Sequence, residues 1–190
     1  MMDLDAWVGR TETRSDYVTA SPIAALAATL DREDPEPRPG DAVPPLWHWL
    51  WFLPIHRQSE LGSDGHPKRG SFLPPVSLPR RMWAGGRFEF YSPLRVGSLI
   101  SRQSRIIDVH QKQGRSGALV FVTVRHEITG PDGLALTEEH DIVYRDRAAP
   151  AGPAASSQSA PAGAAWERIV RPDDVFLFRY SALTFNGHRI

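Results

Sequence analysis

Residues 118–146, ALVFVTVRHEITGPDGLALTEEHDIVYRD, decide the fold. Two long runs, 118–129 and 134–146, flank the four residues Gly130-Pro131-Asp132-Gly133. Tight turns favour Gly, Pro and Asp, because these residues supply a positive φ, a fixed φ or a local side-chain hydrogen bond. The stretch therefore predicts two antiparallel strands that are joined by a tight turn.

More strands precede this hairpin. Residues 99–109 form a third run of strand-like sequence, and residues 111–117 contain the glycines of a connection to the next strand. Residues 86–91 alternate Phe with Arg and Glu, which predicts a further strand. Consecutive long strands with short turns form an antiparallel meander, and one face of such a sheet has to be covered.

A helix predicted over residues 22–30 is the candidate cover. Ser21 is the expected N-cap and Pro22 the expected first helical residue, because Ser accepts a hydrogen bond from the first turn and Pro fits where no N–H is needed. We therefore expect an α+β protein in which an antiparallel sheet wraps around a helix.

Two segments between this helix and the strands are harder to assign. Trp47, Trp49 and Trp51 alternate in an apolar run, which fits a strand or a short buried helix. Residues 56–80 form a long polar stretch with several Gly and Pro, and loops of that length in a compact domain are usually lids or sites. The loop carries basic side chains that could bind a phosphate or carboxylate, or simply lie in solvent: His66, Arg69, Arg80 and Arg81.

Composition excludes several functions. The 190 residues contain no Cys, so disulfides, thiolate nucleophiles and sulfur-bound metals are ruled out. Lys+Arg and Asp+Glu are both 22, which gives no electrostatic reason to expect nucleic acid or an acidic membrane as partner. No apolar run is long enough to span a bilayer. With its acidic N-terminus, the chain is expected to be cytoplasmic.

The C-terminal part looks like a separate unit. Residues 148–164 are almost entirely Ala, Pro, Gly and Ser, which predicts a flexible linker between a first domain at 1–147 and a segment at 165–190. So short a segment cannot bury its own core. It must pack on the first domain, pair with another chain, or begin a second unit that is cut short.

The last residues, FRYSALTFNGHRI at 178–190, hold the strongest chemical signal. His188 and Arg189 follow an Asn186-Gly187 turn, so a titratable group, a fixed cation and an amide lie close together. Such a cluster could bind an anion and move a proton. A frayed, solvated terminus remains the alternative.

This segment resembles the motif that opens the catalytic half of MaoC-like hot-dog dehydratases. The resemblance is to the branch with mesaconyl-CoA and itaconyl-CoA hydratases and mitochondrial 3-hydroxyacyl-thioester dehydratases. Four further phrases look like that branch, in the same order: PPLWHW at 44–49, GHPKRG at 65–70, LPRRMWAGG at 78–86 and PLRVG at 93–97.

The resemblance implies a hot-dog fold, with one complete unit and the start of a second, and hydration of enoyl-CoA or dehydration of 3-hydroxyacyl-CoA. In the family a carboxylate and a His five residues apart transfer protons. Asn186 stands at the carboxylate position, the His is expected beyond Ile190, and His188 belongs to the same motif. CoA would enter as part of the substrate, with no metal or other cofactor. The expected substrate-binding residues are Arg189, His66, Arg69, Arg80, Arg81 and Trp47, the last as part of an acyl pocket or of the core.

Hot-dog units usually place two sheets side by side, so a homodimer or pairing with a second hot-dog unit is expected. Two other functions stay open. The chain could be a non-catalytic subunit that binds acyl-CoA or completes a partner's site, or a purely structural interaction domain without affinity for thioesters.

Overall fold

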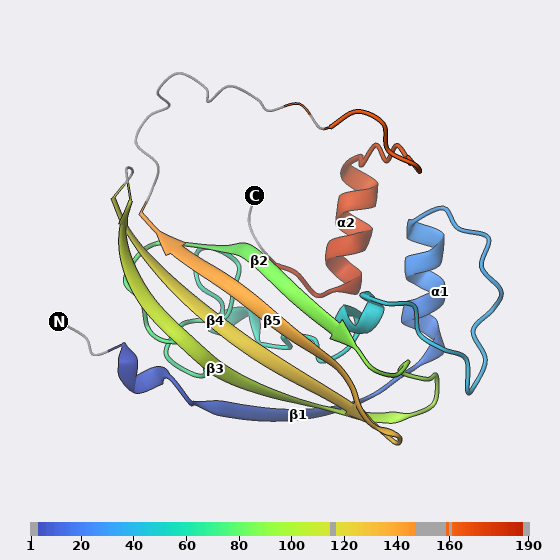
Figure 1. Cartoon of the computed structure of the whole chain (residues 1–190), viewed down its shortest axis with the longest axis horizontal. Helices are drawn as coiled ribbons and strands as arrows, with labels where there is room; N and C mark the ends of the chain where they lie inside the picture. The colour runs from blue at the N-terminus through green and yellow to red at the C-terminus, as the bar shows by residue number, and fades with distance from the viewer. Residues whose placement is uncertain (1–3, 115–116, 147–158, 160, 188–190) are drawn as a thin grey trace.

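A single antiparallel sheet forms the centre of the protein (Figure 1). The computed structural model describes residues 4–114, 117–146, 159 and 161–187. The sheet has five strands in the order β1-β3-β4-β5-β2. Their bounds are β1 Thr11–Tyr17, β2 Arg80–Phe90, β3 Leu99–Gly114, β4 Gly117–Gly130 and β5 Gly133–Arg145.

The predicted meander is confirmed. β4 and β5 pair from Leu119 and Arg145 down to Gly130 and Gly133, so the turn lies where the Gly-Pro-Asp-Gly sequence predicted it. Gly133 has a φ of 96°, a conformation that disfavours residues with a Cβ atom. Two features differ from expectation: β2 begins at Arg80, and β1, which the sequence did not predict, pairs with β3 at one edge of the sheet.

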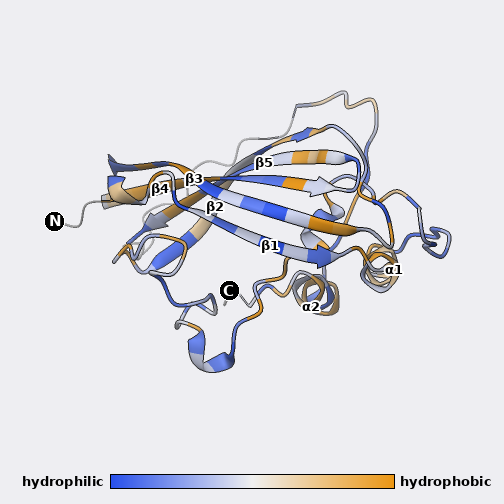
Figure 2. Ribbon diagram, turned by 90° about the horizontal axis from the view of Figure 1, so that it is seen from below, coloured by the Kyte–Doolittle hydropathy of each residue, from blue (hydrophilic) through white to orange (hydrophobic). Residues whose placement is uncertain are grey.

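Two α-helices lie side by side on one side of the sheet (Figures 1 and 2). Helix α1 spans Ala20–Thr29, and its N-cap is Thr19. The prediction of Ser21 as N-cap was therefore wrong by two residues, because Pro22 is accommodated within the first turn, where no N–H is needed. Helix α2 spans Asp174–Leu183.

Three short 3₁₀ helices complete the secondary structure of the described residues. They are η1 Asp5–Trp7, η2 Trp47–Leu50 and η3 Gln58–Glu60. The tryptophan-rich segment is thus a short helix, one of the two predicted alternatives. Within the predicted loop 56–80, η3 lies near the start and β2 begins at Arg80, and the residues between them have neither helix nor strand.

The inner face of the sheet, defined here as the face that carries the buried side chains, has two apolar clusters. The first joins α1 and η2 to one end of the sheet, with Ile23, Leu50 and Ile128 among its members. The second lies at the other end, where loop residues 72–78 pack against side chains such as Ile106 and Tyr144. The predicted helix therefore covers only one end of the sheet.

The C-terminal segment packs on the first unit. Tyr180 and Leu183 of α2 pack against the first apolar cluster. Asp173 caps α2 by accepting a hydrogen bond from the Phe176 backbone N–H at 2.7 Å. The linker predicted at 148–164 falls mostly outside the described residues, and the proposed domain boundaries stay a prediction. Within the described part of the chain, neither α-helix has the length and hydropathy of a membrane-spanning segment.

Candidate functional site

The chain after α2 turns back toward the long loop before β2. Phe185 adopts a left-handed conformation with a φ of 50°, and the Asn186 N–H donates to the Ser181 carbonyl at 2.8 Å, which ends the helix. A Cβ atom built on Gly187 would lie 2.9 Å from the carbonyl oxygen of Gly65. The backbone at Gly187 therefore touches the loop directly. Of the predicted motif residues, His188 and Arg189 lie outside the described residues.

The loop that Gly187 touches carries His66. Its backbone forms a compact turn, in which the Gly62 N–H donates to the His66 carbonyl at 2.7 Å and the His66 N–H donates to Asp64 Oδ1 at 3.2 Å. The structure thus brings together two segments that the sequence singled out separately, residues 65–70 and 185–187.

Arg69 organises the same loop. Its guanidinium donates to the backbone carbonyls of Val76, Leu78 and Pro79, and it lies 5.1 Å from the ring centroid of Tyr144. These bonds fix the segment that leads into β2. Substrate binding by Arg69 stays a prediction, which these contacts neither require nor test.

The other predicted binding residues lie elsewhere. Arg80 and Arg81 are the first residues of β2, opposite Arg145 and Tyr144, so the expectation that they lie in a loop was wrong. The strand extends back to them because β5 offers a backbone partner as far as Arg145. Trp47 is buried in the first apolar cluster, with the Arg32 guanidinium 5.7 Å from its ring.

A row of polar side chains crosses the inner face between the two apolar clusters. Ser104, His126 and Glu138 are direct cross-strand neighbours on β3, β4 and β5, so their side chains point to the same face. Ser104 and Glu138 are buried, and Ser104 Oγ lies 2.8 Å from His126 Nδ1. We call these three residues the polar row.

Helix η2 covers one end of the polar row. His48 Nε2 lies 3.1 Å from Glu138 Oε2, and Trp49 Nε1 donates to Glu138 Oε1 at 3.2 Å. Burial raises the pKa of Glu138 and the hydrogen bond with His48 lowers it, and the net shift is downward. Glu138 therefore remains ionised inside the protein.

Two histidines of this face, His126 and His140, are held neutral by burial. Burial, with the Arg102 charge as second cause, lowers the pKa of His126 to about 3. Burial also lowers the pKa of His140, which lies two residues beyond Glu138 on β5. At neutral pH, His126 therefore offers one N–H donor and one acceptor and carries no charge.

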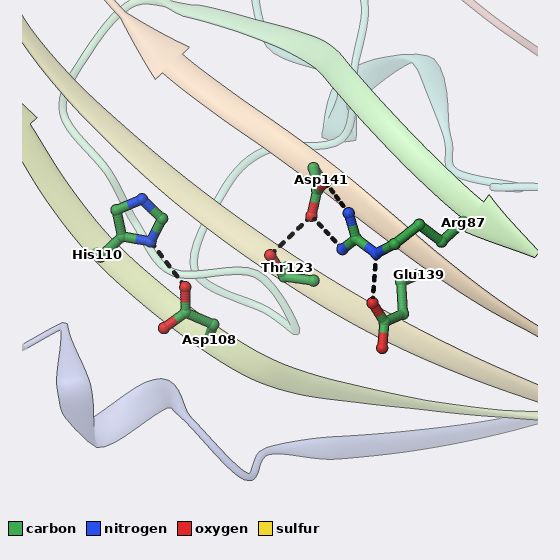
Figure 3. Close-up of polar contacts among 6 residues, drawn as sticks. All are labelled: Arg87, Asp108, His110, Thr123, Glu139 and Asp141. Atoms are coloured by element: carbon green, nitrogen blue, oxygen red, sulfur yellow. Dashed lines mark hydrogen bonds and ion pairs between the residues drawn. The ribbon is translucent and has the colours of Figure 1, made fainter. Parts of the chain in front are cut away.

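A second polar network lies on the outer face and holds strands together (Figure 3). Arg87 of β2 donates to Glu139 at 2.7 Å and to Asp141 at 2.9 Å, and Thr123 Oγ1 donates to Asp141 at 2.8 Å. The hydrogen bond from Arg87 lowers the pKa of Asp141. These contacts join β2, β5 and β4.

Sequence reasoning missed the polar row, although a signal was available. Alternation along a strand puts Glu138 and His140 on the same face as buried Leu136 and Ile142. A carboxylate at a core position is rare unless it is paired, so it marks a site to examine.

Comparison with curated proteins gives matches over nearly the whole chain. The chain is 48% identical over 188 residues to the mesaconyl-C(4)-CoA hydratase of Chloroflexus aurantiacus, which covers 99% of this chain and 67% of that protein. It is 27% identical over 203 aligned positions to the mitochondrial hydroxyacyl-thioester dehydratase type 2 of Schizosaccharomyces pombe, covering 92% of this chain and 67% of that protein.

Solved structures agree on the fold. A MaoC-like dehydratase superposes with a TM-score of 0.64 at 12% identity, covering 97% of this chain and 68% of that chain. The sequence profile of the hydroxyacyl-thioester dehydratase type 2 family matches residues 46–190. The chain therefore belongs to the hydroxyacyl-thioester dehydratase type 2 family, with the α+β hot-dog fold that its sequence predicted.

Proposed function

We propose that this chain is a hydro-lyase that adds water to enoyl-CoA thioesters or removes it from 3-hydroxyacyl-CoA. The observation that carries the proposal is the 48% identity to a mesaconyl-C(4)-CoA hydratase over 188 residues. A short branched dicarboxylic acyl group is therefore the substrate that we propose first.

The reaction sets clear demands on the site. Water adds its hydroxyl to the β-carbon and a proton to the α-carbon, while negative charge builds on the thioester oxygen. We propose that the Asn186 amide hydrogen-bonds the thioester carbonyl or the attacking water, and that His188 acts beside it in proton transfer. No step calls for a metal or redox cofactor, and CoA belongs to the substrate.

Basic and aromatic side chains would hold the substrate. We propose that Arg189, two residues after Gly187 in the sequence, and His66, next to Gly65, bind the thioester or the CoA phosphates. We also propose substrate contacts for Arg69, Arg80, Arg81 and Trp47. Two of these side chains have contacts within the protein: Arg69 binds backbone carbonyls and Trp47 packs in the core.

Pairing and location are also proposals. β2 is an edge strand of the sheet, and its Trp83 side chain is 62% exposed. An unpaired edge with an exposed aromatic side chain favours pairing with another strand. We propose that β2 joins a second hot-dog sheet, in a homodimer or a paired unit, and that the protein is cytoplasmic.

The test is hydration of mesaconyl-C4-CoA, followed as loss of enoyl-thioester absorbance. It is run on the 190-residue chain and on a chain extended beyond Ile190 by His-Tyr-Asp and a following helix, because the family's His lies five residues after the Asn186 position. Asn186→Ala should lower kcat about a hundredfold, the effect of losing one donor to a developing oxyanion. The exposed amide variant Gln113→Ala should leave kcat unchanged.

The proposal is supported if either chain hydrates the thioester and Asn186→Ala lowers its kcat. Binding of the thioester by both chains without turnover would overturn it in favour of a non-catalytic acyl-CoA-binding subunit. Absence of both binding and turnover would fit an interaction domain.

A further inference from the structure

We propose that Arg102 on the inner face, together with the polar row, recognises a free carboxylate on the acyl group of the substrate. This inference rests on the proposed function, and it deepens that function by assigning the acyl class to named residues. Arg102 lies on β3, two residues before Ser104, so its side chain shares the face of the polar row.

The position suits an acyl group. The polar row lies between two apolar clusters, on the face against which Tyr180 and Leu183 of α2 pack. Residues 184–187 follow α2 directly and carry the start of the catalytic motif. Figure 2 shows α2 on one side of the sheet, and because α2 packs against the apolar cluster of the inner face, the polar row and this motif lie on the same side.

Arg102 is a cation of this face without a counter-ion among the described residues. Its guanidinium forms no hydrogen bond or ion pair with any residue in the described part of the chain, and its Nε atom is buried without a partner. It lies 5.0 Å from the ring centroid of Phe52. Burial and the nearby Arg14 charge lower its pKa, which measures how unfavourable this environment is for a cation.

The anions near Arg102 are already engaged. Glu138 is bound by His48 and Trp49, and Glu12 lies 3.5 Å from Arg14. A partly buried cation without a partner costs free energy unless an anion from outside binds it. His48 Nδ1, also buried and without a hydrogen-bond partner among the described residues, adds a further unsatisfied polar atom beside the polar row.

The segment that presents His48 and Trp49 is strained at both ends. Leu46 and Phe52, which flank η2, have φ values of 70° and 57°, where side chains with a Cβ are disfavoured. Asp16 of β1 holds the second of these positions by accepting from the Phe52 N–H at 2.8 Å. Such strain persists where the surrounding structure requires a fixed geometry, as at ligand sites.

An acyl-CoA with an acidic acyl group carries two kinds of anion, a carboxylate and the CoA phosphates, and the carboxylate fits this environment better. The guanidinium binds carboxylate and phosphate alike. A phosphate brings more negative charge next to ionised Glu138, whereas one carboxylate is neutralised by one arginine. A mesaconyl group joined to CoA through its C4 carboxyl carries a methyl and a free carboxylate on the β-carbon. This small branched anion matches a polar row with apolar neighbours on both sides.

The test compares mesaconyl-C4-CoA with 3-methylcrotonyl-CoA, in which a methyl replaces the carboxylate and the CoA phosphates are unchanged. The chain that is active in the hydration assay is used, as wild type, Arg102→Gln, Arg102→Lys and Arg105→Gln. Arg105 is the matched control, because it lies on the same strand but in a shallow hollow of the outer face, beside Arg125.

Arg102→Gln should lower kcat/KM for mesaconyl-C4-CoA about ten- to hundredfold, the effect of losing hydrogen bonds to a charged group. Its kcat/KM for 3-methylcrotonyl-CoA should not fall. Arg102→Lys should recover part of the loss, and Arg105→Gln should behave as wild type. The kcat/KM of wild type should be at least tenfold higher for mesaconyl-C4-CoA than for 3-methylcrotonyl-CoA. This comparison can be made even if Arg102→Gln does not fold.

Four results would overturn the inference. An equal loss for both thioesters would assign Arg102 to the CoA phosphates or to the fold, and unchanged kinetics would remove it from the site. A wild type that hydrates both thioesters equally well would refute carboxylate recognition while leaving the hydro-lyase proposal intact. If neither the 190-residue chain nor the extended chain hydrates either thioester, both proposals are overturned.

Discussion

Replacing Glu138 by Gln should destabilise the fold by about 2–3 kcal/mol at pH 7. The carboxylate receives hydrogen bonds from His48 at 3.1 Å and from Trp49 at 3.2 Å. Hydrogen bonds to ionised groups are worth about 1.5–3 kcal/mol each and are roughly twice as strong as neutral ones. The Gln amide also turns one acceptor into an N–H donor, which would face the donor of Trp49 or His48.

Urea unfolding followed by circular dichroism measures this change. Glu139→Gln is the control, because Glu139 neighbours Glu138 but points to the outer face, where it pairs with exposed Arg87. An exposed pair contributes about 0–1 kcal/mol. If the two variants lost equal stability, or Glu138→Gln lost less than about 0.5 kcal/mol, the reasoning on the polar row would be refuted.

The pH dependence gives a second check on Glu138. Its pKa is lowered in the folded protein, so the folded state binds the proton more weakly than the unfolded state. The stability that this group contributes is therefore complete above the unfolded pKa, about 4.3, and is lost as pH falls through the folded pKa. The difference in free energy of unfolding between wild type and Glu138→Gln should become smaller below about pH 4.

Three further predictions follow from other contacts. The pKa of His126 is about 3 in the folded protein and about 6.5 in the unfolded chain, so the free energy of unfolding should fall by about 2 kcal/mol between pH 7 and pH 5. In urea titrations, His126→Gln should make the free energy of unfolding depend less on pH over this range. Gly187→Ala should lower hydratase kcat at least about tenfold, because its Cβ would meet the Gly65 carbonyl at 2.9 Å and displace the motif; unchanged kcat would refute this. Asp173→Ala should lose about 1 kcal/mol through the α2 cap, seen as faster amide hydrogen exchange confined to residues 174–183.

Local signals in the sequence located most of the sheet. The Gly-Pro-Asp-Gly turn and the long runs on either side of it predicted β4 and β5, because turn chemistry and strand length act within a few residues. β1 was missed because Thr11–Tyr17 is polar on both faces and becomes a strand only by pairing with β3. Its partner lies far along the chain, so no local pattern reports it.

The candidate site was predictable only in part. The motif phrases pointed to residues 65–70 and 185–187, and the structure joins these segments. The polar row needed cross-strand register, which places Ser104, His126 and Glu138 side by side although each lies on a different strand. Arg102 was invisible for the same reason: an arginine in a strand looks solvent-exposed until the face it points to is known.

The contact between α1 and α2 has a consequence for synthesis on the ribosome. Helix α1 ends at Thr29 and its neighbour begins at Asp174, so 144 residues lie between them. At about 5–20 residues per second, the ribosome needs about 7–30 s to deliver the second helix. During this time the apolar side of α1 lacks its partner, so nascent chains should bind chaperones until α2 emerges.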